Sequence, residues 1–294
     1  MYKPIKKQLP VWGKKTYLMG ILNITPDSFS GDGLLQSAQN RQAVLEQART
    51  FAAAGADMLD IGGESTRPGA LPVSTDEELE RVVPVIELLV EEGLDVILSV
   101  DTYKAAVAEA AINAGAHWVN DVWGLRADPA MAEVVARFQA PVVLMHNRSQ
   151  PKLAEVQERL GGRYVGTDYA DLIPDVCAEL MHSVQLAHQA GISDKRILLD
   201  PGIGFGKTVQ QNLFLFNHLD QIKVLGYPVL LGPSRKSFIG YTLDLPVEER
   251  FEGTAAAVVV GMLRGADVIR VHDVAQMARV IKMTDAILRD RPST

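Results

Sequence analysis

Hydrophobic residues along this chain follow two alternating patterns. Eight short runs rich in Val, Ile and Leu are nearly continuous, and longer amphipathic segments separate them. Continuous apolar runs are typical of parallel strands buried on both faces. The predicted strands are residues 16–23, 57–63, 95–101, 117–121, 141–146, 196–200, 228–232 and 267–272.

The segments between the strands carry the signals of helices. The apolar positions of residues 41–54 form one helical face: Val44, Leu45, Ala48, Phe51 and Ala52. Gly55 follows and suits the left-handed end of a helix, and similar endings recur at residues 114–117, 189–192 and 264–267. Thr75 with Glu78 resembles a capping box that opens the next helix.

Eight strand–helix units that close on themselves make a (β/α)₈ TIM barrel, an α/β fold. We expect one domain over residues 1–294, with residues 1–16 as an N-terminal extension; a doubly wound open sheet is the alternative. Three long segments follow strands, at residues 25–40, 64–75 and 147–168, and their Gly, Ser, Pro and Asp content predicts mobile loops. In a barrel these loops lie on the C-terminal face, where active sites are built.

Composition narrows the classes of function. The formal charge of −7 argues against a general nucleic-acid binder, so an anionic ligand needs local cations. The single cysteine, Cys177, lies in an apolar helical pattern and predicts a buried structural thiol in a reducing, cytoplasmic setting. The N-terminal segment has no continuous apolar region, and no window reaches eighteen apolar residues, so neither a secretory signal nor a membrane span is expected.

A glycine-rich segment at residues 198–208, LLDPGIGFGKT, resembles a phosphate-binding loop. A Walker loop needs glycine at the position of Pro201, and the dinucleotide pattern GxGxxG needs glycine at the position of Lys207. Both patterns therefore fail. The informative residue is Asp200, which lies where a predicted strand ends.

Mostly polar residues lie at or just after the ends of the predicted strands. They are Asn23; Asp60, with Glu64 and Arg67 nearby; Asp101; Asn120 and Asp121; Met145, His146 and Asn147; Asp200; Ser234, Arg235 and Lys236; and Arg270, His272 and Asp273. Strand ends are often polar for structural reasons alone. As a set around one rim, however, these residues predict convergence on a cavity.

One subset offers two carboxylates and an amide from three strands, Asp101, Asn120 and Asp200. These groups suit a neutral heterocycle with several N–H donors and a carbonyl, because carboxylates accept such donors strongly. The structural alternative is that the acids form core ion pairs with Lys236 or Arg270. A zinc hydrolase is disfavoured, because His146 and His272 lack an HxH or HExxH partner.

A second subset can hold an anion, and its members are Asn23, Arg67, Arg270 and His272. Arg270 and His272 are two residues apart on one strand, so their side chains point to the same side. Together the four residues suit a diphosphate, with Asn23 helping to hold Mg²⁺ on it. The alternative for Arg67 is a solvated cation in a loop.

These residues, in this order, resemble the dihydropteroate synthase family between about residues 17 and 288. The matching motifs are GILNITPDSFSGDG, DIGGESTRPGA, SVDT, NDV, LMHNR, LLDPGIGFGK, GPSRKSFIG and IRVHDV. The resemblance implies a TIM-barrel transferase that joins 6-hydroxymethyl-7,8-dihydropterin diphosphate to 4-aminobenzoate. Its products are 7,8-dihydropteroate and diphosphate, on the folate pathway. It also implies a homodimer.

The resemblance assigns roles by position. The pterin would contact Asp101, Asn120, Asp200 and Lys236, with Met145 and Arg270 lining the ring faces. Diphosphate and Mg²⁺ would be held by Asn23, Arg67, Arg270 and His272. The aminobenzoate pocket would be shaped by Phe29, Thr66, Pro68 and Ser237, and the catalytic groups would be Arg67, Lys236, Arg270 and His272.

Three positions depart from the family pattern: the first loop reads SGDG, Tyr103 follows the third strand, and Pro233 precedes SRK. They leave every expected ligand in place and affect only the expected conformations of loops. Two other functions stay open from the residues alone. One is a pterin-dependent methyltransferase barrel, against which TRPG and IRVH count because it needs no diphosphate clamp. The other is a non-catalytic pterin-binding protein.

Overall fold

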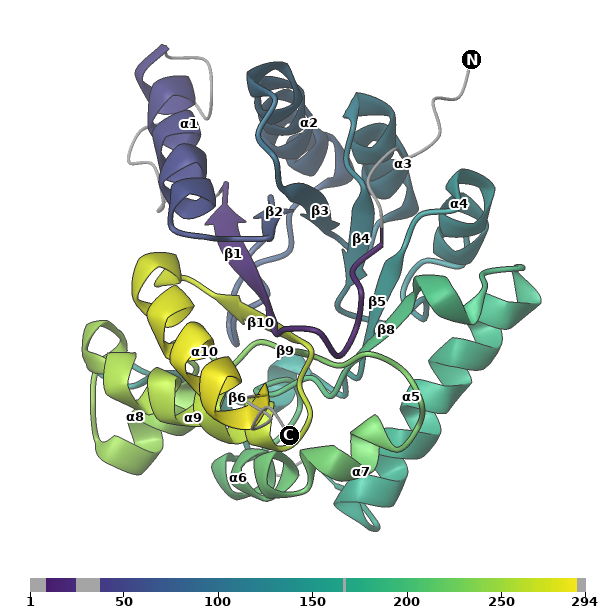
Figure 1. Cartoon of the computed structure of the whole chain (residues 1–294). Coiled ribbons are helices and arrows are strands. Elements are labelled where there is room, and N and C mark those ends of the chain that lie inside the picture. The colour runs from purple at the N-terminus through teal and green to yellow at the C-terminus, as the bar shows by residue number, and fades with distance from the viewer. Residues whose placement is uncertain (1–8, 25–37, 166–167, 290–294) are drawn as a thin grey trace, which may run out of the picture.

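The computed structural model describes residues 9–24, 38–165 and 168–289. Its main sheet is parallel, with strand order β8-β5-β4-β3-β2-β1-β10-β9. The strands are β1 (Tyr17–Asn23), β2 (Met58–Gly62), β3 (Ile97–Asp101), β4 (Trp118–Asp121), β5 (Val142–Met145), β8 (Ile197–Asp200), β9 (Leu230–Leu231) and β10 (Val268–Val271). A bridge between Leu199 and Val229 joins the two edges of the sheet. The predicted barrel is therefore confirmed, and the open sheet is wrong (Figure 1).

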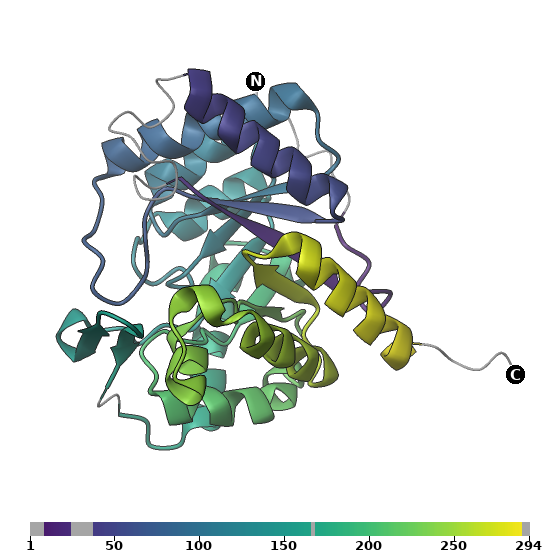
Figure 2. The same cartoon turned by 90° about the vertical axis from the view of Figure 1, so that its left-hand side faces the viewer.

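Helices surround this barrel (Figures 1 and 2). Within the described residues they are α1 (Ala38–Ala53), α2 (Thr75–Glu92), α3 (Ala105–Ala114), α4 (Met131–Phe138), α5 (Leu172–Gln189), α6 (Val209–Asn217), α7 (Leu219–Lys223), α8 (Ser237–Leu243), α9 (Phe251–Leu263) and α10 (Val274–Arg289). Short 3₁₀ turns add η1 (Pro151–Leu153), η2 (Asp194–Arg196) and η3 (Val247–Glu249). The connections after β8 and β9 each contain two α-helices, where the sequence pattern predicted one.

The predicted glycine endings are confirmed. Gly55, Gly115, Gly191 and Gly265 all have left-handed backbone angles, with φ of 98°, 117°, 89° and 100°. The predicted capping box of α2 is wrong. Ser74 is its N-cap and accepts a hydrogen bond from Glu77 N at 3.2 Å, while Glu78 is buried and pairs with a lysine.

One predicted loop is also wrong. Residues 147–168 contain η1 and a two-stranded antiparallel hairpin, β6 (Ala154–Gln157) and β7 (Gly161–Tyr164). The segment at residues 64–74 has neither helix nor strand, as expected. Residues 25–37 lie outside the described part of the chain, together with the predictions made for them.

The interior of the barrel begins with an apolar layer to which each strand contributes one side chain. Its members are Met19, Met58, Ile97, Trp118, Val143, Leu198, Leu230 and Val268. Leu9, Trp12 and Tyr17 pack against this layer, so the chain before β1 covers the amino-terminal end of the barrel. A second, larger core lies between the sheet and the helices. The barrel is thus closed at one end, and its opposite rim is the place for a site.

Two smaller expectations concern Cys177 and the membrane. Cys177 lies on α5 and is only half-buried, where full burial was expected. Burial still raises the pKa of its thiol, which disfavours the reactive thiolate. Among the described helices, none combines the length and the apolar character that a membrane crossing needs.

Candidate active site

A polar layer lies directly above the apolar one. Side chains alternate along a strand, so the residues two positions further along also face inward. They include Asp60, Ser99, Asn120, Met145, Asp200 and Arg270. All of these except Arg270 are buried. The carboxyl half of the barrel is therefore lined by groups that water does not solvate.

Arg270 is the centre of this layer. Its Nε donates to Asp60 Oδ2 at 2.6 Å, and its Nη2 donates to Asp101 Oδ2 at 2.6 Å. Asn120 Nδ2 donates to the same Asp60 oxygen at 2.9 Å. The structural alternative considered for the acids is therefore partly realised, because Arg270 does pair with Asp101. One guanidinium cannot neutralise two carboxylates, however.

Several acceptors in this layer remain unused. Among the buried side-chain atoms of the described chain, Asp60 Oδ1, Asn120 Oδ1 and Ser99 Oγ have no hydrogen-bond partner. Leaving such a group unpaired costs about 1–3 kcal/mol, and more if it is charged. An arrangement that keeps unused acceptors side by side is typical of a site for a ligand rich in N–H donors.

The raised pKa of Asp101 also indicates a site for a ligand that donates hydrogen bonds. Burial raises its pKa to about 7, against the attraction of Arg270, and the nearby acids Asp60, Glu78 and Asp121 raise it further. A ligand that donates hydrogen bonds to the carboxylate would favour its charged form.

Asp200 lies at the end of β8, beside Met145 in register. Its Oδ1 accepts from Gly202 N at 2.7 Å. Burial raises its pKa, against the attraction of Lys236. Lys236 donates to the Ile203 carbonyl and lies 4.6 Å from the centre of the Phe205 ring. Burial lowers the pKa of Lys236 to about 8, against the attraction of Asp200. The half-buried Lys236 and the buried Asp200 thus lie close enough at the rim to attract one another.

The glycines of the segment after β8 allow close backbone contacts. A Cβ on Gly202 would lie 1.8 Å from the His146 carbonyl oxygen, and Gly202 has a left-handed φ of 68°. Lys207 completes the turn and is 1% exposed. Its Nζ contacts His146 Nδ1 at 2.9 Å, the Gly202 carbonyl at 3.0 Å and the Phe205 carbonyl at 3.1 Å. Burial lowers the pKa of Lys207, and its amino group donates to two backbone carbonyls of the turn, so the glycine segment is folded around this lysine.

A cationic region lies beside the polar layer. His272 Nδ1 contacts Ser234 Oγ at 3.0 Å. Burial, followed by the positive charges of Arg270, Arg235 and Arg67, lowers the pKa of His272 to about 3. Of these arginines, Arg235 is paired with Asp273. The imidazole is therefore neutral. Arg270 is also paired, with Asp60 and Asp101, so within the described residues Arg67 is the cation of the three that is available to an anion there.

The remaining predicted residues lie around the same rim. Asn23 ends β1, half-buried and in register with Gly62 of β2. Thr66 and Pro68 are half-buried in the loop after β2, and Arg67 is exposed. Ser237 is the first residue of α8, directly after Lys236. Phe29 lies outside the described residues.

A buried ion-pair cluster holds the base of the loop that carries Arg67. Lys104 Nζ donates to Glu64 Oε2 and Glu78 Oε2, both at 2.5 Å, and to the Val73 carbonyl at 2.7 Å. Tyr103, one of the departures from the family pattern, donates to Glu64 Oε1 at 2.9 Å. Both ends of the loop are therefore tied to the residues after β3.

Sequence reasoning missed the roles of Asp60 and Lys207. Asp60 lies two residues beyond Met58, whose side chain faces the interior of the barrel. This spacing is the signal that groups Asp60 with Asn120, to which it is hydrogen-bonded. In the sequence, Lys207 belongs only to a segment that fails to match a Walker loop. Nothing in the local sequence reveals that its amino group is buried against His146 and the carbonyls of Gly202 and Phe205.

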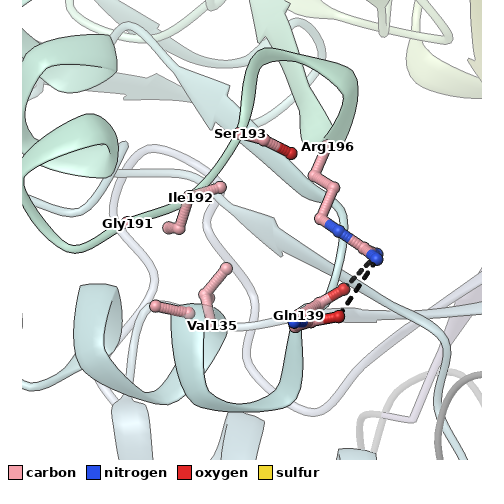
Figure 3. A pocket seen from close by; sticks show the side chains of 7 residues that line it. Val135, Gln139, Gly191, Ile192, Ser193 and Arg196 are labelled. Carbon is pink, nitrogen blue, oxygen red and sulfur yellow. Dashed lines mark hydrogen bonds between the residues drawn. The ribbon is translucent and has the colours of Figure 1, made fainter.

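A separate shallow hollow lies at the amino-terminal ends of β5 and β8. Its lining includes Val135, Gln139, Ile192, Ser193 and Arg196. Figure 3 shows that Arg196 spans it and reaches Gln139, whose backbone and side-chain oxygens it contacts. This hollow is on the face opposite the polar rim and has no part in the site.

Fold and rim together define a pterin-binding barrel. The family described as "Pterin binding enzyme" matches residues 19–272, and the chain belongs to it. Dihydropteroate synthase from Bacillus subtilis is 52% identical over 275 residues, 94% of this chain and 90% of the relative. The resemblance expected from the motifs is thereby confirmed.

Two solved structures extend this similarity. Dihydropteroate synthase from Clostridium difficile, solved in the presence of pteroic acid, has a TM-score of 0.85 and 45% identity, covering 95% of this chain and 99% of its own. The Xanthomonas albilineans enzyme with 4-aminobenzoic acid has a TM-score of 0.83 and 40% identity, covering 95% of each chain.

Proposed function

We infer that this chain is a transferase that condenses 6-hydroxymethyl-7,8-dihydropterin diphosphate with 4-aminobenzoate, giving 7,8-dihydropteroate and diphosphate for folate biosynthesis. The observation that carries the inference is the pairing of two unlike sites. In the described part of the chain, buried acceptors without partners lie in the barrel, and three arginines, Arg67, Arg235 and Arg270, lie near His272 beside them. The similarity to dihydropteroate synthases supports the same reaction.

The pterin would enter the polar layer. Its N–H donors would pair with Asp101, Asp200 and the Asn120 amide oxygen, and Lys236 would donate to a ring acceptor. Met145 and Arg270 would line its faces. Asp60 joins this set, because its Oδ1 is buried and without a partner in the described chain.

The diphosphate would then lie at the cationic side, near Arg67, Arg270 and His272. A methyltransferase barrel or a non-catalytic pterin binder needs no such charge beside the pterin. His272, kept neutral by its surroundings, would donate a hydrogen bond to a diphosphate oxygen through its free ring nitrogen.

Mg²⁺ would be held mainly by the diphosphate. Asn23 offers one amide oxygen, a suitable ligand for this cation. Within residues 9–24, 38–165 and 168–289, no group of three or more His, Cys, Asp or Glu side chains is arranged to hold a metal. When bound, the cation would supply further charge neutralisation to the leaving group.

Catalysis follows from these charges. The bond between the pterin methylene carbon and the diphosphate oxygen breaks, and its electron pair leaves with diphosphate. The 4-aminobenzoate nitrogen then bonds to that carbon and loses a proton to solvent. We favour an SN1-like order, because the pterin ring stabilises positive charge on the methylene carbon. Arg67, Lys236, Arg270 and His272 would contribute charge stabilisation and positioning, without a strong base.

The aminobenzoate would bind between Thr66 and Pro68 on one side and Ser237 on the other, with Phe29 as a further wall. We also propose a cytoplasmic homodimer. Exposed apolar side chains on neighbouring helices support the dimer: Phe214 of α6, Val260 and Leu263 of α9, and Met283 and Ile287 of α10. The single cysteine is consistent with a reducing compartment.

Release of diphosphate by purified protein with Mg²⁺ tests the reaction. We expect fast release only when the pterin diphosphate and 4-aminobenzoate are both present, and pteroate as the second product. Release that ignores aminobenzoate would exclude the condensation. Methyl transfer from a reduced folate would indicate the alternative barrel, and pterin binding without any turnover would indicate a binding protein.

A further inference from the structure

The β6–β7 hairpin occupies the connection between β5 and α5, on the same rim as the site. It takes no part in the barrel sheet. In Figure 2 this teal hairpin projects at the left of the view, near the blue loop that follows β2. The functional residues described above do not include it.

On one side the hairpin touches the loop that carries Arg67 and Pro68. A Cβ on Gly162 would lie 2.7 Å from Pro68 Cβ and 2.8 Å from the Pro68 carbonyl oxygen. A Cβ on Gly69 would lie 2.9 Å from Val156 Cγ2 of β6. The two segments are therefore closer than side chains on these glycines would allow, and the loop rests directly on the hairpin.

On the other side the hairpin is bound to α8. Tyr241 donates its hydroxyl hydrogen to the Gly161 carbonyl at 3.3 Å, and the Arg163 guanidinium lies 4.4 Å from the centre of the Tyr241 ring. Arg159 pairs with Asp244 at the end of the same helix. The hairpin is thus fixed against the helix that begins with Ser237.

Arg250 strengthens this attachment from below. It is 2% exposed, and its Nη2 donates to the Leu160 carbonyl in the hairpin turn at 2.9 Å. Its Nη1 donates to the Arg235 carbonyl at 3.0 Å. One buried guanidinium therefore joins the hairpin turn to the segment that leads into Lys236 and Ser237.

We propose that the β6–β7 hairpin is a specificity element for the second substrate, because it sets the separation of Pro68 from Ser237. The inference rests on the proposed function, which gives these two residues the opposite walls of the aminobenzoate pocket. The loop at residues 64–74 has no helix or strand to fix its tip, and the hairpin supplies that support. Gly162 is the residue that allows the close contact.

The test replaces Gly162→Ala and measures the steady-state kinetics of both substrates. Carbon atoms pack best at about 3.5–4.0 Å, so the new methyl group must displace Pro68 by about 1 Å. We expect the KM for 4-aminobenzoate to rise at least about fivefold, since displacements of this size in a substrate site are costly. The KM for the pterin diphosphate should stay within about twofold, because the polar layer is not touched.

Gly161→Ala is the matched control. Gly161 is adjacent, has a left-handed φ of 67°, and has no atom within 4 Å of an added Cβ. The change therefore strains the hairpin backbone without contacting Pro68, and the aminobenzoate KM should rise by less than in Gly162→Ala. Tyr241→Leu is a second variant, which removes two of the contacts between the hairpin and α8 and should raise the same KM by a smaller factor.

The outcomes separate the two proposals. An active parent whose Gly162→Ala and Tyr241→Leu variants keep the parental aminobenzoate KM would overturn the role of the hairpin and leave the reaction intact. An equal rise in both substrates' KM values, or an equal effect of Gly161→Ala, would also overturn it, since general strain would then be the cause. A parent without condensing activity would remove the proposed function, and this inference with it.

Discussion

Replacing Lys207→Met should destabilise the protein by far more than an ordinary lysine substitution. The change keeps most of the length of the side chain and removes its three contacts, with His146 Nδ1 and the carbonyls of Gly202 and Phe205. Each buried acceptor left unpaired costs about 1–3 kcal/mol. The sum is offset in part, because burying the lysine amino group has a desolvation cost of its own, which lowers the pKa of Lys207. We expect a net loss of about 2–4 kcal/mol.

Urea unfolding followed by circular dichroism measures this loss. Lys207→Gln, which keeps two N–H donors, should lose less than Lys207→Met. Lys195→Met is the control, because Lys195 is exposed at the start of the same strand–loop unit, and surface changes usually stay within about 0.5 kcal/mol. The same Lys207→Met protein should also bind pterin more weakly, since Asp200 is held by Gly202 N in the segment that Lys207 anchors.

A Lys207→Met protein as stable as the parent would refute the reasoning. It would mean that the carbonyls of Gly202 and Phe205 find other hydrogen-bond donors, so that the turn after β8 does not depend on Lys207. Normal stability with weakened pterin binding would contradict only the energetic part and would keep the positioning of Asp200.

Four other predictions concern the ligands. Asp101→Asn or Asp200→Asn should weaken pterin binding by about 1.5–3 kcal/mol, a factor of roughly 10–150, whereas normal binding with a much lower melting temperature would show that the acid serves only core ion pairs. Burial raises the pKa of Asp101 to about 7, so its carboxyl is protonated below that pH. Pterin affinity measured by calorimetry should therefore rise as the pH increases through about 7. Asp101→Asn should remove this dependence. Arg67→Ala should mainly lower kcat in the diphosphate-release assay, and unchanged turnover would argue that Arg67 is only a solvated cation. Aminobenzoate should bind measurably by calorimetry only when diphosphate, Mg²⁺ and a non-reacting pterin are present. Equal aminobenzoate affinity without these ligands would argue that the pocket is preformed.

The barrel was predictable because each strand is a separate apolar run and each run ends in a polar group. The same periodicity brought Asp101, Asn120 and Asp200 to one rim. Contacts between distant segments were not predictable in this way. The hairpin at residues 154–164 lacks the alternation of a buried strand, since Ala154 to Gln157 are half-buried or exposed.

Capping rules also failed to locate the start of α2, because two neighbouring residues are both suitable N-caps. Ser74 and Thr75 are both good N-caps, and the burial of Glu78 against Lys104 decides between them through a contact that no local pattern contains. Asp60 was harder to assign because its importance depends on Arg270, 210 residues away in the chain. Such pairings follow only from the closed barrel.

The order of the strands has a consequence for synthesis on the ribosome. Arg270 belongs to β10, the last strand to be made, and β10 lies between β1 and β9 in the sheet. Until it emerges, Asp60 and Asp101 have no guanidinium between them, and the first strand has one unpaired edge. A nascent chain that ends before residue 270 therefore carries most of the pterin ligands but lacks the guanidinium that pairs with Asp60 and Asp101. We expect such chains to need protection from aggregation, and the ability to bind pterin to arise in one step with the final strand.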